Sequence, residues 1–223
     1  MKPNFLGKRL LFITAHPDDE SFLAAGTMYK NFLAGGKSAL ICATYGEKGK
    51  ARLGKSVTSR QLASMRKKEL EKVSQFLHVA NLFAFRLPDG NLTSKTMTLS
   101  AKIEKIIKKW KPDFIFSFGP DGVSGHMDHI CIGEVSKKLS KKFSIQFLMF
   151  SATPTFIKEF ELAQNRRSFG VYSSKIVHSG HSLKVTIDPK VKHKALSMHA
   201  SQQIFEHLTK KTIHEILHYE YFR

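Results

Sequence analysis

Short apolar runs and helical apolar periodicities alternate along the first 150 residues. Apolar runs bounded by Gly, Pro or polar residues are typical of buried strands, and they occur at 10–14, 38–44, 81–87, 113–118 and 145–151. Apolar residues spaced three and four apart predict helices at 21–34, 58–77, 98–110 and in a stretch that ends near 142. Strands that alternate with helices form a mainly parallel sheet with helices on both faces. The sequence therefore predicts an α/β, Rossmann-like fold.

The pattern weakens after Pro154. We expect a strand within 177–187, then a helix that Asp188 caps and that runs to about 203, and a last helix over 206–219. No internal repeat, low-complexity segment or linker interrupts the sequence. The prediction is one domain over 1–223, in which 1–150 form the core sheet and 151–223 complete the pocket.

The composition is that of a globular protein without a disulfide framework. Of the 223 residues, 42% are hydrophobic, and the two cysteines, Cys42 and Cys131, each lie among apolar neighbours. Reduced, buried thiols favour a cytoplasmic location. No apolar run reaches the roughly 18 residues of a spanning helix, so a transmembrane segment is not expected. The apolar stretch near the N-terminus is short and ends in aspartates, so a signal peptide is not expected either.

The chain is strongly basic. Thirty-six Lys and Arg residues against 18 Asp and Glu residues give a formal net charge of +18. This balance favours an anionic partner, which could be a phosphorylated or carboxylated substrate, an acidic membrane surface or nucleic acid. The lysines recur in helical register rather than in one tract interleaved with aromatic residues. That spacing favours solvated helix faces over a nucleic-acid site.

Polar side chains follow two of the predicted strands. The run 10–14 leads into HPDDE, with His16 and Asp19, and the run 113–118 leads into a glycine-rich turn with His126, Asp128 and His129. Parallel strands end at the same edge of a sheet, so these groups can converge there. Two imidazoles and one carboxylate, with a position left for water, form a catalytic zinc site. The alternative is a helix cap after the first strand and surface histidines after the other.

These two segments resemble the signatures of one family. The chain is similar to the LmbE/PIG-L family of zinc-dependent N-deacetylases, in which a strand ends in (A)HPDDE and a later turn contains HxDH. The similarity rests first on AHPDDE at 15–20 and GHMDH at 125–129. Weaker likeness extends through TYGEKG at 44–49, LPDG at 87–90, KPDFIFSFGPDG at 111–122 and KALSMHASQ at 194–202.

The resemblance implies a role for each residue of the two segments. It implies three zinc ligands, which are His16, Asp19 and His129. It implies Asp18 as the general base that takes a proton from the attacking water, and His126 as the group that stabilises the oxyanion or protonates the leaving amine. Asp128 matches the carboxylate that orients His126. Glu20 is left over, and we interpret it as a charge in the first turn of a helix.

The resemblance also implies substrate contacts and a reaction. The candidate contacts with the sugar are Lys48, Arg52, Arg66, Asp89 and His199, and ordinary solvated charge is the alternative for the first four. The implied reaction removes an N-acetyl group from an N-acetylglucosamine-type amino sugar conjugate, with an anionic aglycone compatible with the basic charge. Two other functions remain open. One is a metal hydrolase of the same fold acting on another amide, a carbamoyl group or an ester, and the other is a basic protein that binds nucleic acid or an acidic surface. Fe²⁺ or another divalent ion in place of Zn²⁺, and a homo-oligomer, also remain open.

The C-terminal sequence contains a second metal-like pattern. His214, Glu215 and His218 match HExxH, the zincin signature. A catalytic zinc needs a third protein ligand, which known patterns place well downstream of the second histidine. Only five residues follow His218. We therefore interpret this segment as an amphipathic helix that buries Ile213, Ile216 and Leu217.

Overall fold

A seven-stranded sheet runs through the protein, with the strand order β3-β2-β1-β4-β5-β7-β6. The computed structural model describes residues 4–49, 51, 56–152, 155–156, 159, 183–202 and 209–223. Its strands are β1 (Arg9–Thr14), β2 (Lys37–Cys42), β3 (Asn81–Ala84), β4 (Phe114–Ser117), β5 (Gln146–Ser151), β6 (Leu183–Thr186) and β7 (Tyr219–Phe222). Strands β1 to β5 are parallel, while β7 lies antiparallel between β5 and β6. The predicted mainly parallel α/β sheet is confirmed.

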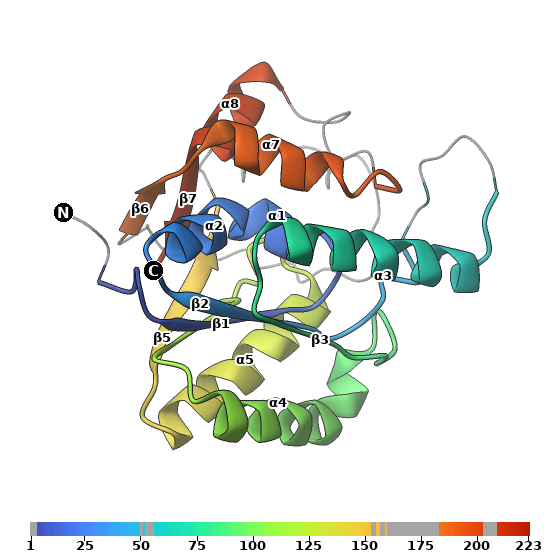
Figure 1. The fold of residues 1–223 in the computed structure, drawn as a ribbon. Helices are drawn as coiled ribbons and strands as arrows, with labels where there is room; N and C mark the ends of the chain where they lie inside the picture. The colour runs from blue at the N-terminus through green and yellow to red at the C-terminus, as the bar shows by residue number, and fades with distance from the viewer. Residues whose placement is uncertain are drawn as a thin grey trace.

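Helices cover both faces of this sheet. They are α1 (Asp19–Leu23), α2 (Ala25–Leu33), α3 (Ser59–Phe76), α4 (Thr96–Trp110), α5 (Met127–Lys142), α7 (Pro189–Ser197) and α8 (Lys210–His218), with a short 3₁₀ helix, η1 (Leu92–Lys95). Figure 1 shows α4 and α5 on one face and α1, α2 and α3 on the other, with α7 lying outside α1 and α2. None of the helices in the described ranges is both long enough and apolar enough to cross a membrane.

The core is built on the central strands. In β1, Leu10 to Ile13 are completely buried, as expected for a strand with helices on both faces. Phe116 of β4 stacks on Phe12, with ring centroids 4.7 Å apart, and meets the edges of Phe5 and Phe222 at 5.1 Å each. The C-terminal strand β7 is therefore packed into the same core as the N-terminal half of the sheet.

One predicted helix is two helices. The pattern at 21–34 indicated a single helix, but the backbone breaks at Ala24, where φ is −150°. The first amides of α2, those of Gly26 and Thr27, donate to the carboxylate of Glu220 at 2.9 and 2.8 Å. A carboxylate at a helix N-terminus satisfies amides that have no partner within the helix and opposes the helix dipole favourably. The break thus has a cause in β7, nearly 200 residues away.

Several other boundaries differ from the predicted ones. The strands predicted at 38–44 and 81–87 end at Cys42 and Ala84, and the helix expected to reach 203 ends at Ser197. The last helix ends at His218. Tyr219, which was predicted to be its final residue, is instead the first residue of β7. The strand expected within 177–187 is β6, and residues 177–182 of that prediction lie outside the described ranges.

Candidate active site

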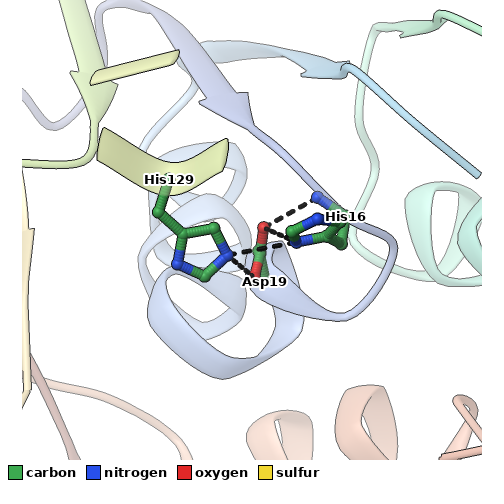
Figure 2. A group of neighbouring side chains, drawn as sticks. All are labelled: His16, Asp19 and His129. Carbon is green, nitrogen blue, oxygen red and sulfur yellow. Dashed lines mark hydrogen bonds and ion pairs between the residues drawn. The ribbon is translucent and has the colours of Figure 1, made fainter. Parts of the chain in front are cut away.

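The segments that follow β1 and β4, which contain the candidate metal ligands, meet at one edge of the sheet. β1 pairs directly with β4, with Leu10 opposite Phe114 and Phe12 opposite Phe116. The turn after β1 and the turn between β4 and α5 therefore start side by side. Figure 2 shows His16, Asp19 and His129 pointing toward one another from these two segments. The predicted convergence of these side chains is confirmed.

The three expected ligands form one compact group. Nε2 of His129 lies 3.1 Å from Nδ1 of His16 and 3.2 Å from Oδ1 of Asp19. Nδ1 of His16 lies 3.7 Å from Oδ2 of Asp19, and one ligand atom from each residue fits within a span of 4.8 Å. All three side chains are at most about an eighth exposed. Such a buried His₂Asp set has the donor types that zinc prefers.

Backbone contacts hold these side chains in place. Oδ2 of Asp19 accepts hydrogen bonds from the amides of Ala15 and His16, at 3.1 and 2.8 Å. Nδ1 of His129 donates to the carbonyl oxygen of Gly122 at 3.0 Å. Because that bond places the proton on Nδ1, the lone pair of Nε2 faces His16 and Asp19. This is the tautomer that a metal ligand needs.

The charge balance of the group also suits a cation. Burial lowers the pKa of His16, but hydrogen bonds to Asp128 and Asp89 and the charge of Asp19 outweigh it and raise that pKa to about 10. Burial raises the pKa of Asp19, but the contacts of its carboxylate with His129 and His16 hold that pKa well below its usual range. Several carboxylates thus surround the imidazoles, and a divalent cation would neutralise the excess negative charge. The residues present therefore fit a metal ion.

A second group adjoins the first. Asp128 accepts hydrogen bonds from the amides of Gly90 and Leu92, at 2.7 and 2.9 Å, and its carboxylate lies 3.3 Å from Nε2 of His16. His126, the residue before α5, accepts the amide of Asp128 on Nδ1 at 3.1 Å. The contact that was expected to orient His126 is thus made by the backbone of Asp128, and its carboxylate faces His16 instead.

His126 is held as a neutral imidazole. Burial lowers the pKa of His126 to about 4, because it disfavours adding a positive charge to this ring, and the adjacent imidazoles of His129 and His16 act in the same direction. Because Nδ1 accepts a hydrogen bond, the single ring proton lies on Nε2. His126 is therefore a hydrogen-bond donor at neutral pH. The centroid of its ring lies 4.7 Å from that of His16 and 5.0 Å from that of His129.

Asp18 adopts an unusual backbone conformation. Its φ is 113°, in a region that residues other than glycine rarely enter, and its side chain makes no capping bond to α1. The carboxylate instead pairs with Nη2 of Arg66 at 2.8 Å, and Asp18 keeps about a quarter of its side-chain surface exposed. Burial raises the pKa of Asp18, and Arg66 opposes that shift. Asp18 is thus an acidic side chain next in sequence to Asp19, one of the three expected ligands, but it is paired with a different residue.

The predicted substrate residues lie in different places. Arg66 is almost fully buried and donates to the carbonyl oxygens of Gly46 and Pro17 as well as to Asp18. Asp89 lies in the cluster itself, 3.1 Å from Nε2 of His16, and accepts the amide of Lys48 at 2.8 Å. Lys48 is thus at the site through its backbone. Arg52 lies outside the described residues.

His199 is not where a substrate contact would be. Its side chain has no exposed surface, and Nε2 lies 2.7 Å from Oε1 of Glu20 and 3.1 Å from Oγ of Ser21. Glu20 lies in the first turn of α1, as predicted, but it is also completely buried. Three consecutive acidic residues follow Pro17. Since neighbouring carboxylates repel one another, this run was the sequence signal that each of them needs a partner of its own.

The HExxH segment forms α8. His214 and His218 lie on the same side of this helix with ring centroids 4.2 Å apart, while Glu215 accepts a hydrogen bond from Thr155. No third ligand joins them among the described residues. Ile216 is buried, whereas the other two apolar residues expected to be buried, at 213 and 217, are only partly covered.

The model of the family described as "GlcNAc-PI de-N-acetylase" (PIG-L) matches residues 11–140. A probable N-acetyl-α-D-glucosaminyl L-malate deacetylase 2 of Bacillus anthracis is 31% identical over 129 residues, 57% of each chain. A 1D-myo-inositol 2-acetamido-2-deoxy-α-D-glucopyranoside deacetylase of Corynebacterium diphtheriae is 24% identical over 173 residues, 68% of this chain and 58% of that protein. The chain thus spans a little under three fifths of the length of these relatives.

Solved structures share the fold across nearly the whole chain. The N,N'-diacetylchitobiose deacetylase of Pyrococcus horikoshii superposes with a TM-score of 0.68 at 23% identity, covering 97% of this chain and 83% of that one. The hydratase GalB of Pseudomonas putida reaches 0.65 at 16% identity, covering 88% and 80%. Deacetylases and a hydratase therefore share this fold, and the fold alone does not define the reaction. The family match to residues 11–140 contains the complete His₂Asp group, and the chain belongs to the GlcNAc-PI de-N-acetylase (PIG-L) family.

Proposed function

We propose that this protein is a divalent-metal-dependent amidohydrolase that removes the N-acetyl group from an N-acetylglucosamine-type conjugate. The observation that carries the proposal is a buried His₂Asp group with a separate carboxylate, Asp18, and a neutral imidazole, His126, beside it. The relatives with the sequence similarity described above are deacetylases of amino sugar conjugates. Among divalent ions we propose zinc, because two imidazoles and a carboxylate are its usual catalytic ligands.

His16, Asp19 and His129 would hold the ion. A bound zinc supplies a Lewis acid and lowers the pKa of a water molecule to about 7. Asp18 takes the proton of the attacking water, which requires a carboxylate that is not itself a ligand. Asp18 pairs with Arg66, so its carboxylate has a partner outside the ligand group. His126 donates a hydrogen bond from Nε2–H to the carbonyl oxygen as negative charge develops there. The proton taken up by Asp18 then passes to the amine nitrogen as the C–N bond breaks. The products are acetate and a free amino sugar.

The remaining polar groups position the reacting ones. Asp128 and Asp89 both face Nε2 of His16, at 3.3 and 3.1 Å. A carboxylate on the second ring nitrogen of a ligating histidine fixes its orientation and makes it a better ligand. We therefore assign Asp128 and Asp89 to the support of His16. The net charge of +18 supports an anionic aglycone.

Acetate release from a panel of N-acetylglucosamine conjugates tests the proposal. We expect release by the zinc-loaded protein, loss with a chelator and recovery with zinc. Asp18→Asn should keep the metal and lose turnover by roughly 10²–10⁴-fold, whereas His16→Ala should lose both. Equal metal loss in the two variants would contradict the assigned roles.

A wider panel that adds other amides, carbamoyl compounds and esters separates the alternatives. Release from another amide, a carbamoyl compound or an ester, without acetate from any amino sugar, would keep the metal site and replace the substrate class. A binding protein for nucleic acid would instead show no metal-dependent turnover and an affinity that falls steeply with salt concentration.

A further inference from the structure

Three polar side chains form a buried cluster behind the site. Glu20, Ser21 and His199 are each at most 1% exposed. Oε1 of Glu20 accepts hydrogen bonds from Oγ of Ser21 at 2.7 Å and from Nε2 of His199 at 2.7 Å. Glu20 and Ser21 belong to α1, whereas His199 follows α7, 179 residues later. None of the three can touch a substrate from these positions.

The second oxygen of Glu20 connects this cluster to Asp18. Oε2 accepts the backbone N–H of Asp18 at 3.0 Å. Arg66 donates to the carbonyl oxygen of Pro17, which is the other end of the same peptide unit. Both ends of the peptide between Pro17 and Asp18 are therefore held by charged side chains. A hydrogen bond to a charged group is stronger than one between neutral groups.

That peptide needs holding because its conformation is unfavourable. Asp18 has φ 113° and ψ −27°, a combination that an L-residue with a Cβ adopts only when its surroundings enforce it. The amide of Asp19, the next residue, is not held in this way and bonds weakly to the carbonyl of His16 at 3.3 Å. The position of the Asp18 carboxylate thus depends on Glu20 and Arg66.

His199 in turn fixes the direction of Glu20. Because a carboxylate only accepts hydrogen bonds, the proton on His199 must lie on Nε2. His199 and Ser21 occupy Oε1, which leaves Oε2 to face the amide of Asp18. Nδ1 of His199 is buried and has no hydrogen-bond partner among the described residues. The Nε2 contact with the Glu20–Ser21 pair is therefore what holds the ring.

We propose that Glu20 and His199 are positioning residues that hold the backbone of Asp18 in its strained conformation and so set the place of the general base. This inference rests on the proposed function, in which Asp18 takes the proton of the attacking water. His199 lies outside the stretch 11–140 that matches the family model. The C-terminal part of the chain thus contributes to the site without touching substrate.

Kinetics of His199 variants test the inference. His199→Leu removes the donor to Glu20, and we expect kcat to fall by roughly 10–100-fold, the effect of a displacement of about 1 Å in a reacting group. KM and the bound zinc should stay within about twofold of the wild type. His199→Gln, whose amide N–H can reach Glu20, should recover most of kcat, and His199→Asn, with a shorter side chain, should not. His193→Gln, an exposed histidine on α7, is the matched control.

A double variant separates positioning from general loss of structure. In the Asp18→Asn background, His199→Leu should cause no further fall in the residual turnover, because the group that it positions is already absent. Independent factors that multiply would show that His199 acts elsewhere, and the proposal would fail. If His199→Leu does not fold, His199→Asn replaces it in this comparison.

A crystal structure of metal-free His199→Leu, or of His199→Asn, provides a readout without activity. We expect Asp18 to leave the positive-φ region and its carboxylate to move away from Arg66. An unchanged Asp18 would overturn the inference even if turnover fell. If the wild-type protein releases no acetate from any conjugate, the proposed function fails, and this structure still decides whether Glu20 and His199 hold Asp18.

Discussion

Glu220→Gln should destabilise the protein more than any change at its surface. Glu220 in β7 forms an ion pair with Lys192 in α7, with Oε1 and Nζ 2.5 Å apart and both side chains essentially unexposed. Nζ of Lys192 also donates to the carbonyl oxygen of Phe22 at 2.7 Å. Glu220 in addition accepts the first amides of α2. Replacing this carboxylate with an amide leaves a buried ammonium group without its counter-charge.

The size of the effect follows from that uncompensated charge. Removing one partner of a buried ion pair costs about 3–5 kcal/mol of the free energy of unfolding. In a protein of this size each kcal/mol lowers Tm by about 2–4 °C. We therefore expect the free energy of unfolding at pH 7 to fall by about 3–5 kcal/mol in urea denaturation. In calorimetry, Tm should fall by roughly 6–20 °C. A Tm within 2 °C of the wild type would refute the reasoning.

The deficit should shrink as the pH rises. Burial lowers the pKa of Lys192 in the folded protein, while Glu220 and, more weakly, Glu20 raise it. Without the carboxylate of residue 220 the pKa of folded Lys192 falls further below the unfolded value of about 10.4. Between these two values the unfolded state binds more protons, so the free energy of unfolding increases with pH. The variant should therefore approach the wild type in urea titrations between pH 7 and 10.

Two further variants isolate the ion pair. Lys192→Met leaves Glu220 bound to two helix amides, where a carboxylate is favourable, so it should cost less than Glu220→Gln. The double variant should be more stable than Glu220→Gln alone, because it no longer buries a lone ammonium group. Lys194→Met, an exposed lysine on the same helix, should change the free energy of unfolding by less than about 0.5 kcal/mol.

Other substitutions test separate parts of the structure. Gly46→Ala should lower turnover, because its Cβ would lie 2.0 Å from Nη1 of Arg66 and its φ is +65°; restored turnover on extra zinc would contradict this. Gly133→Ala should lower the free energy of unfolding by about 1–3 kcal/mol in urea denaturation, because the new Cβ would lie 2.4 Å from the carbonyl oxygen of Phe118. His214→Ala should leave zinc content and acetate release unchanged, and loss of zinc would give α8 a role in metal binding.

The features predicted correctly from sequence are those specified by nearby residues. The helix predicted at 58–77 is α3, and a capping box between Thr58 and Gln61 is present at its start with both hydrogen bonds. Asp188 caps α7 by accepting the amide of Lys190 at 2.8 Å, with Pro189 at the first helical position. The meeting of the two ligand segments was predictable for a similar reason, because each segment directly follows a buried parallel strand.

The features that sequence analysis missed depend on partners far along the chain. The break between α1 and α2 is stabilised by Glu220, and the fixed position of Glu20 by His199. Strand β7, with the sequence YEYF, was missed because its buried residues are Glu220 and Phe222. A charged residue at an inward position removes the alternation of apolar and polar residues by which a half-buried strand is recognised.

The same contacts explain how a polar active site can be stable at the end of a buried strand. Asp18, Asp19 and Glu20 are three consecutive carboxylates, which would repel one another if left without partners. Each has its own positively charged or hydrogen-bonding partner: Arg66 for Asp18, His129 for Asp19 and His199 for Glu20. Since these partners come from α3, α5 and the segment after α7, the acidic run can form in this geometry only when distant parts of the chain have packed around it. The site and the C-terminal end of the fold are therefore parts of one structure, although the groups that we propose to react all lie in the N-terminal part.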